Sequence, residues 1–334
     1  MVVDRLTPQD LMNLWPDDLG WPMDLGALAI LDGVGLRDAQ GRFDLGAVRK
    51  AVEGRLPLVP RFGQILLTPR PGLGRPLWVD AQTFDVRDHV GVLPLVAGAD
   101  ERELLAAVEQ LRSRRLDRSR PLWEMWLLPG LSRGRVGMFI RLHHTVADGV
   151  AGAATLGALL DEEPDAPGSP ATPWTPRPPP TSLDLLLDNI CHRLAAVGHL
   201  VGLLARPVAT ARQVRLAWPA ARTGLFDRSA PRTSLNRPVG AHRRLVLVRA
   251  RLDSMKEIAH VHGGTVNDVL LAAVAGGTRQ LLGGRGDRVD GVVLRAFVPM
   301  SLHRRARARP AATRRPSWSR ACPSASPTTS RGCA

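Results

Sequence analysis

Apolar residues recur with two different spacings along the first half of the chain. In segments 44–56 and 101–116 they return every three or four residues, and this spacing predicts two helices that each bury one face. The buried face of the second helix would consist of Leu104, Leu105, Val108 and Leu111. Segments 123–128 and 136–142 are short and strongly apolar, and they predict strands. A chain that mixes helices and strands in this way is expected to adopt an α/β (α+β) fold.

A proline-rich stretch divides the chain into two parts. Residues 164–180 contain eight prolines, so we expect an extended linker that cannot join a sheet. Apolar residues then repeat with helical spacing over 183–204, with Thr181 or Ser182 as the cap and Pro207 as a kink or an end. We favour a helix that packs on the protein's own core, because amphipathic helices are common in globular folds. Since arginines follow its apolar face, a helix that lies on an anionic membrane surface is the alternative.

A second alternation of strand and helix follows this helix. We expect strands over 244–252 and 292–298. Between them we expect one helix over 253–262 that ends at Gly263, and a second over 265–282 that Thr265 caps. We predict an N-terminal domain over 1–163, a linker over 164–180 and a connecting helical segment over 181–232. The start of a second domain follows over 233–302, and a basic tail over 303–334.

Composition indicates a folded protein of the cytoplasm. The chain has 334 residues, of which 44% are hydrophobic and 23% charged, and this suffices for sizeable cores in two domains. No apolar run reaches the roughly 18 residues that span a bilayer, and the N-terminus lacks the basic start and apolar core of a signal peptide. Three cysteines form neither a disulfide framework nor a zinc motif. A reducing cytoplasm therefore fits best.

Much of the net charge of +14 lies in the last segment. Residues 303–334 hold eight arginines, no acidic residue and no Leu, Ile, Val, Phe or Met. One interpretation is a basic tail that binds anionic lipid or nucleic acid. We favour the other, a frameshift in GC-rich DNA, because 43 arginines against two lysines in the whole chain indicate a GC-rich gene. No nucleic-acid-binding motif accompanies the charge, so we expect no nucleic-acid partner.

The candidate chemistry lies at the end of the predicted strand 136–142. Alternate residues from Val136 to Leu142 share one apolar face, which is expected to point inward. His144 has the same parity as this face, whereas His143 points the other way. Only His144 is therefore expected to be aimed at the interior. Because a histidine with its ordinary pKa of about 6.5 can accept a proton near neutral pH, His144 is a candidate general base.

Asp148 and Gly149 follow the two histidines. Asp148 can hold the local geometry through a salt bridge or a hydrogen bond at a helix start, and Gly149 lets the backbone turn tightly. A metal site built from His143, His144 and Asp148 is the alternative. We expect no metal, because adjacent histidines on a strand diverge and no third ligand has a suitable spacing.

Four stretches resemble a family of lipid enzymes. HHTVADG, at 143–149, resembles the HHxxxDG signature of the CoA-dependent acyltransferase superfamily. RPLWEMWLLPGL, at 120–131, resembles the PLW motif of bacterial wax ester synthase/diacylglycerol acyltransferases, and TVNDVLLAAVAGGTRQLL, at 265–282, resembles their ND motif. LTPQDLMNLW near the start, with MDLGALAIL at 23–31, resembles their opening strand. The resemblance covers residues 1–302.

The resemblance implies a chloramphenicol-acetyltransferase-like fold of two related αβ domains with a channel between them. It implies that His144 takes a proton from an acceptor hydroxyl, whose oxygen attacks the thioester of acyl-CoA without a covalent acyl-enzyme. The acceptor would be diacylglycerol or a long-chain alcohol, and the product a triacylglycerol or a wax ester. Acyl-CoA would be a substrate, and no cofactor is expected. Because the substrates are lipids, the cytoplasmic protein would lie at the inner face of the membrane or at a lipid-droplet surface.

The resemblance also implies residues that support the reaction. His143 would be a supporting residue, Asp148 would be structural, and Gly149 would keep the substrate channel open. Asn267 and Asp268 would support the site from the second domain. For Asp268 we favour a structural role, because a carboxylate three residues after Thr265 stabilises a helix N-terminus.

Three residues of the PLW motif, Pro121, Leu122 and Trp123, would shape the path of the acyl chain. For Trp123 the structural alternative, which we favour, is a core side chain that touches no substrate.

The chain departs from the family pattern after residue 302. The second domain would be incomplete, which leaves a sheet edge unpaired and an apolar face exposed. We therefore expect a poorly active or inactive polypeptide. Two other interpretations stay open: a transferase with a non-lipid acceptor, and a non-catalytic remnant of the same fold that binds acyl-CoA or membranes.

Overall fold

The computed structural model describes residues 3–146, 157–159, 174–226, 231–237, 240 and 242–296. These residues belong to two compact units, and each unit is described by itself. Unit 1 comprises Met1–Leu200 and Val239–Val246, and unit 2 comprises Val201–Pro238 and Leu247–Ala334.

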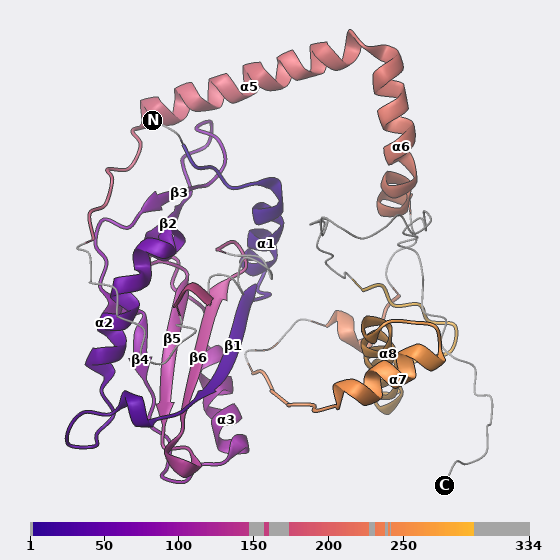
Figure 1. Ribbon diagram of the computed structural model, residues 1–334. Helices are drawn as coiled ribbons and strands as arrows, with labels where there is room; N and C mark the ends of the chain where they lie inside the picture. The colour runs from indigo at the N-terminus through magenta and orange to yellow at the C-terminus, as the bar shows by residue number, and fades with distance from the viewer. Residues whose placement is uncertain are drawn as a thin grey trace. The chain divides into compact units, whose positions relative to one another are not determined.

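A four-stranded sheet forms the centre of unit 1 (Figure 1). The strands stand in the order β1-β6-β5-β4, and they span Asp24–Leu31, Val136–His143, Trp123–Pro129 and Val90–Val92 respectively. β6 is antiparallel to both β1 and β5, whereas β4 is parallel to β5. The predicted strands 123–128 and 136–142 are thus confirmed as β5 and β6. A separate antiparallel pair consists of β2 (Gln64–Leu67) and β3 (Leu77–Asp80).

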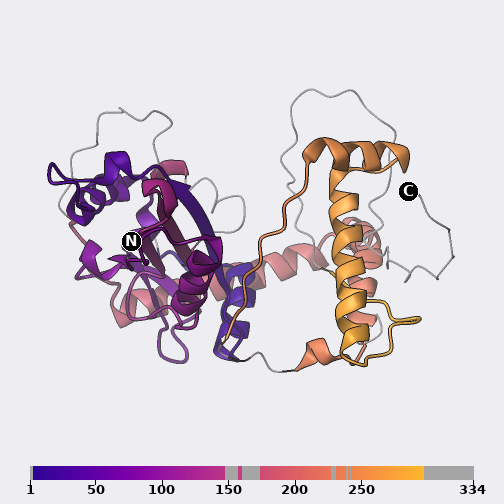
Figure 2. The same cartoon turned by 90° about the horizontal axis from the view of Figure 1, so that it is seen from below.

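One helix covers each face of the four-stranded sheet (Figure 1 and Figure 2). α2 (Leu45–Arg55) packs on one face through Val52, and α3 (Glu101–Arg112) packs on the other through Leu104 and Val108. Asp44 and Asp100 cap the two helices, each by accepting a backbone N–H from the first turn. Both predicted helices are confirmed, although α3 ends four residues before the expected Leu116.

Because both faces of the sheet are covered, all eight residues of β6 are buried. Ile140 packs in the core on the α2 side, and Phe139 packs in the core on the α3 side. The strand therefore has two inward faces, and the prediction of a single inward face was wrong. The close approach of α3 also explains Gly137, since a Cβ atom there would lie 2.7 Å from Leu104 Cδ1.

A capped helix, α1 (Pro8–Asp18), precedes β1 in the chain. Thr7 and Asp10 form a reciprocal capping box at its start. Its last turn contains no basic residue and ends with two carboxylates, Asp17 and Asp18.

Short 3₁₀ turns connect the larger elements at Val34–Leu36, Leu56–Leu58, Pro60–Gly63, Val86–Asp88, Ser132–Gly134 and Ser234–Asn236.

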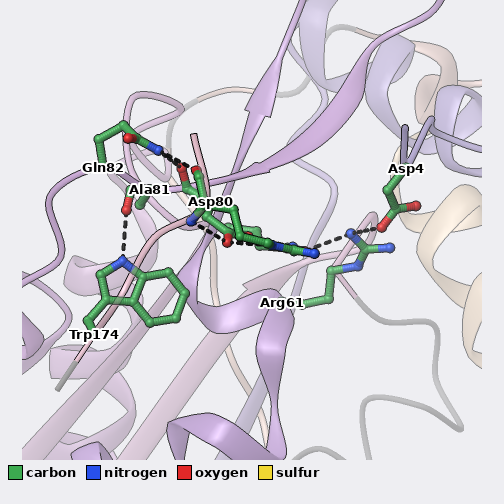
Figure 3. A network of polar contacts seen from close by, with 8 residues as sticks. Asp4, Arg61, Asp80, Ala81, Gln82 and Trp174 are labelled. Atoms are coloured by element: carbon green, nitrogen blue, oxygen red, sulfur yellow. Dashed lines mark hydrogen bonds and ion pairs between the residues drawn. The ribbon is translucent and has the colours of Figure 1, made fainter. Parts of the chain in front are cut away.

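The end of the proline-rich stretch is held on unit 1 by polar contacts (Figure 3). The guanidinium of Arg177 donates two hydrogen bonds to the carboxylate of Asp80, at 2.9 and 3.0 Å. Trp174 Nε1 donates to the carbonyl of Ala81 at 2.8 Å. The Trp174 ring fits only because position 63 is glycine, since a Cβ there would lie 2.1 Å from the ring. Residues 174–180 join no strand, as expected for the linker, but this end of it is anchored.

The long helix after the linker is α5 (Ser182–Leu204), and Thr181 caps it as predicted. Leu185 is buried against β3. Leu185 is not part of the apolar row that was predicted to face the core. The residues of that row are exposed, with Leu194 at 65% and Val197 at 58%. The favoured prediction, a helix packed on the core, was therefore wrong for this row, and Leu185 alone is buried. No helix within the described residues combines the length and the apolar character that a membrane crossing needs.

The described part of unit 2 is helical. It contains α6 (Pro207–Phe226), α7 (Leu252–Val261) and α8 (Val266–Gly284). The helix break at Pro207 and both predicted helices of this region are confirmed. The predicted strands 244–252 and 292–298 were wrong as far as they are described, because residues 242–250 and 292–296 pair with no other strand. An extended apolar segment becomes a strand only when another strand supplies its hydrogen bonds.

Candidate active site

The two adjacent histidines lie where β6 ends. His143 is the last residue of the strand, and its backbone N–H donates to the carbonyl of Leu122 at 2.9 Å. His144 begins the following turn, and its backbone N–H donates to the carbonyl of Met23 at 2.8 Å. The start of β1 and the start of β5 therefore fix the backbone of the pair from both sides.

His143 is enclosed, with an exposed fraction of 3%. The backbone N–H of Thr145 donates to Nδ1 of His143 at 3.2 Å, and the Thr145 hydroxyl lies 2.8 Å from the same atom. Because a backbone N–H can only donate, Nδ1 is the acceptor, and the proton of the neutral ring is on Nε2. Burial lowers the pKa of His143, and the nearby carboxylate of Asp17 opposes this shift in part.

His144 is half-buried, whereas its neighbour His143 is enclosed. Its Nδ1 is buried and accepts no hydrogen bond from the described residues. The prediction that only His144 faces the interior was wrong, because α3 covers the face on which His143 lies. The role of His144 as the general base stays a prediction.

Charged groups gather beneath His143. Asp24 is its direct partner across the β1–β6 pair, and Oδ2 of Asp17 lies 3.8 Å from its Nε2. A cavity of about 20 Å³, room for roughly one water molecule, is lined by these three side chains and by Arg118 and Arg141 among others. These carboxylates and arginines were not predicted from the sequence as site residues. A pair of carboxylates at a helix C-terminus is electrostatically unfavourable, and this feature of the sequence could have marked Asp17 as a candidate site residue.

The PLW residues lie beside the histidines and are buried. Trp123 is fully enclosed, stacks on Phe62 with ring centres 4.5 Å apart, and donates its indole N–H to the Phe62 carbonyl at 2.9 Å. This geometry supports the core role for Trp123. Leu122 lines the small cavity beneath His143. A role of Pro121, Leu122 or Trp123 in the acyl path stays a prediction.

The remaining predicted site residues lie either outside the described residues or in unit 2. Asp148 and Gly149 lie outside the described residues. Asn267 and Asp268 are exposed residues of α8 in unit 2. The predicted cap is confirmed, because Thr265 and Asp268 form a reciprocal capping box at the start of α8. A role of Asn267 or Asp268 at the site stays a prediction.

Two further features of the structure concern ligand binding. Within the described ranges, no three His, Cys, Asp or Glu side chains are grouped so that they could hold a metal ion. A larger cavity of about 490 Å³ lies between α5 and the loop before β3, with Arg5, Arg75 and Arg193 among its lining residues. It contains neither histidine of the pair, so it does not belong to the candidate active site.

Comparisons with known proteins agree on one family. A family model described as the wax ester synthase/diacylglycerol acyltransferase catalytic domain matches residues 6–270. The probable diacylglycerol O-acyltransferase tgs1 of Mycobacterium tuberculosis is 31% identical over 302 residues, which cover 90% of this chain and 62% of that protein. The probable diacylglycerol O-acyltransferase tgs3 of the same species is 31% identical over 265 residues, which cover 77% of this chain and 96% of that protein.

A solved structure gives the same result for the fold. The wax ester synthase/diacylglycerol acyltransferase from Marinobacter aquaeolei VT8 is 25% identical, with a TM-score of 0.55, and the match covers 86% of this chain and 63% of that chain. The predicted α/β fold of the chloramphenicol acetyltransferase type is thereby confirmed. The chain spans 59% to 62% of the length of several of the curated relatives that it matches. On the family match and the tgs3 relative, the chain belongs to the wax ester synthase/diacylglycerol acyltransferase family.

Proposed function

We propose that the end of β6 is the reaction centre of an acyl-CoA-dependent O-acyltransferase. The acceptor is a diacylglycerol or a long-chain alcohol, and the product is a triacylglycerol or a wax ester. The observation that carries the proposal is the family match over residues 6–270, which includes the PLW residues and both histidines. The half-buried ring of His144, next to the enclosed ring of His143, supports it.

His144 acts as the general base in this proposal. Its ring takes the proton of the acceptor hydroxyl while the oxygen attacks the thioester carbonyl of acyl-CoA. The C–S bond then breaks, CoA leaves as a thiolate, and the proton returns from His144 to the sulfur. No covalent acyl-enzyme and no cofactor are needed. Asp148 and Gly149 keep their proposed roles in local geometry and in the channel.

Product analysis tests this proposal. Palmitoyl-CoA labelled in the acyl chain is supplied to the 334-residue chain with hexadecanol, with dioleoylglycerol or with neither. We expect a slow reaction, in keeping with the prediction of a poorly active polypeptide. Its ester product requires an acceptor and appears together with an equal amount of released CoA. His144→Ala removes this product, whereas His192→Ala, which changes an exposed histidine of α5, does not. Binding of palmitoyl-CoA without any CoA release would contradict the enzyme and support the non-catalytic remnant.

The exposed apolar row of α5 supports contact with a lipid surface as part of this function. Leu194 and Val197 are exposed, and Arg193 is an exposed cation on the same helix. An apolar row with cationic neighbours suits the interface of an anionic bilayer. The chain should therefore sediment with vesicles that contain phosphatidylglycerol. The double variant Leu194→Gln, Val197→Gln should lose most of this binding, and equal binding by the variant would contradict the proposal.

A further inference from the structure

The last turn of α1 carries negative charge, which is unfavourable at a helix C-terminus. Asp17 and Asp18 lie at the C-terminus of the helix, where the helix dipole and the free carbonyl groups repel negative charge. No basic residue of the same turn offsets this repulsion. Arginines from the segment after α3 supply the compensation instead. Arg118 contacts both carboxylates at 2.5 Å, and Arg115 donates to the Asp17 carbonyl at 3.2 Å.

The two carboxylates share one arginine but differ in their surroundings. The side chain of Asp18 is 49% exposed, so its ion pair with Arg118 is a surface contact. The side chain of Asp17 is only 11% exposed and lies against the buried ring of His143. A carboxylate at an unfavourable helix position, drawn out of solvent toward a histidine, indicates a role beyond the stability of α1.

We propose that Asp17 is a positioning residue for the histidine pair: its carboxylate, fixed by Arg118, faces the Nε2–H of His143 and holds that ring in one orientation. Thr145 holds the other side of the ring through Nδ1. At 3.8 Å, Asp17 Oδ2 and His143 Nε2 are beyond hydrogen-bond distance, so the carboxylate acts through its charge. Thr145 at Nδ1 and the charge of Asp17 opposite Nε2 thus keep the His143 ring in place. A fixed His143 in turn restrains the turn that carries His144. This step rests on the proposed acyltransferase function.

Besides burial, four charged or titratable groups shift the pKa of His143, and Arg114, Arg115 and Arg141 also line the cavity beneath it. The four groups are Asp17 of α1, Asp24 of β1, Arg118 of the segment after α3 and His144 of the turn after β6. The two carboxylates raise the pKa of His143, whereas Arg118 and His144 lower it. A change at Asp17 should therefore be visible directly in the titration of His143.

The test compares two single variants at the neighbouring positions 17 and 18. Asp17→Asn and Asp18→Asn each remove one negative charge from the same arginine, but only Asp17 faces His143. In NMR spectra of the full chain with labelled histidine, Asp17→Asn should shift the titration midpoint of His143 downward by about one pH unit. Asp18→Asn should leave it in place. Equal midpoints in the two variants would overturn the proposal.

A third variant keeps the test decisive if His143 of the parent chain titrates below the accessible pH range. Arg118→Gln removes the charge that offsets Asp17, so the midpoint of His143 should rise. Addition of Asp17→Asn to this variant should reverse the rise, and a double-mutant cycle isolates the coupling of the two residues. A rise that persists without the Asp17 charge would overturn the proposal.

Kinetics separate this inference from the proposed function. With acyl transfer as the readout, Asp17→Asn should lower kcat about tenfold with little change in KM, because it disturbs orientation and not binding. Asp17→Glu, which restores the charge, should recover part of the rate. If the chain transfers no acyl group, the proposed function fails, but the titration of His143 still decides whether Asp17 acts on it.

Discussion

Two buried histidines of the same sheet show how different surroundings give one residue type different uses. His89, just before β4, is 4% exposed, and His143 is 3% exposed. Burial lowers the pKa of both rings. His89 lies between the rings of Phe84 and Trp123, with ring centres 5.2 and 4.7 Å away. The ring of His143 instead faces the carboxylate of Asp17.

The two rings also hold their protons on opposite nitrogens. Nδ1 of His89 lies 2.9 Å from the Trp123 carbonyl, which can only accept, so the proton of His89 is on Nδ1. Nδ1 of His143 accepts from Thr145, so its proton is on Nε2. His89 is thus satisfied by packing and by a backbone carbonyl. His143 directs an N–H toward paired charges next to the half-exposed His144. The comparison indicates that burial alone does not determine the role of a histidine, whereas the groups at its two nitrogens distinguish a ring packed in the core from one that faces charges.

The largest effect on this comparison is expected from the loss of Trp123. Trp123→Ala removes the ring that stacks on both Phe62 and His89, together with the hydrogen bond from its indole N–H. Loss of a fully buried Trp should lower the free energy of unfolding by about 3–5 kcal/mol. Urea unfolding measures this change. A loss below about 1 kcal/mol would show that the aromatic stack does not organise this core.

A second prediction concerns acid stability. A histidine held neutral by burial binds a proton more readily in the unfolded chain, so its contribution is complete above the ordinary pKa of about 6.5 and is lost as pH falls below it. The free energy of unfolding should fall between pH 7 and pH 5. His89→Phe keeps the stacked ring but cannot titrate, so the variant should lose less stability over this range. Identical pH profiles for the two proteins would show that His89 is not held neutral.

The smallest effect is expected at Asp80, which anchors the chain segment next to the His89 stack. Arg177 donates to Asp80 and lowers the pKa of this carboxyl. Trp174, three residues before Arg177, packs against Phe84. Asp80→Asn should therefore lower the free energy of unfolding at pH 7 by about 1 kcal/mol, because Arg177 is largely exposed.

The same carboxyl also has a predictable pH dependence. Because its folded pKa is lowered, Asp80 stabilises the fold above the ordinary carboxyl pKa, and this contribution is lost as pH falls below about 3.9. The difference between the parent chain and Asp80→Asn should therefore shrink with acidification. A difference that does not change between pH 7 and pH 3 would contradict this role.

Local features were predicted correctly from the sequence in both units. Thr181 and Thr265 cap helices as expected, because a cap depends on residues three positions apart. β5 and β6 were predicted because their composition is strongly apolar. The prediction that His143 points out of the interior failed because α3, which covers that face, is distant in the sequence. The same holds for Asp17, which lies close to His143 in the fold but far from it in the sequence.

The strand predictions in the second half of the chain failed for a related reason. The segment 244–252 has strand-like composition, but a strand also needs a partner, which composition does not reveal. The family was accessible from sequence because the PLW, HHxxxDG and ND motifs follow one another in this order along the chain. The carboxylates beneath His143 were not accessible, since no short motif contains both.

The central claim is that His144 performs the chemistry at the end of β6, whereas His89 serves only the fold. CoA release from palmitoyl-CoA with hexadecanol, measured for the parent chain, His144→Ala and His89→Phe at equal amounts of folded protein, tests it most directly. We predict that His144→Ala lowers the rate by at least about 100-fold without unfolding the protein, and that His89→Phe keeps the parent rate. A His144→Ala variant that releases CoA at the parent rate, or a folded parent chain that releases none, would contradict the claim.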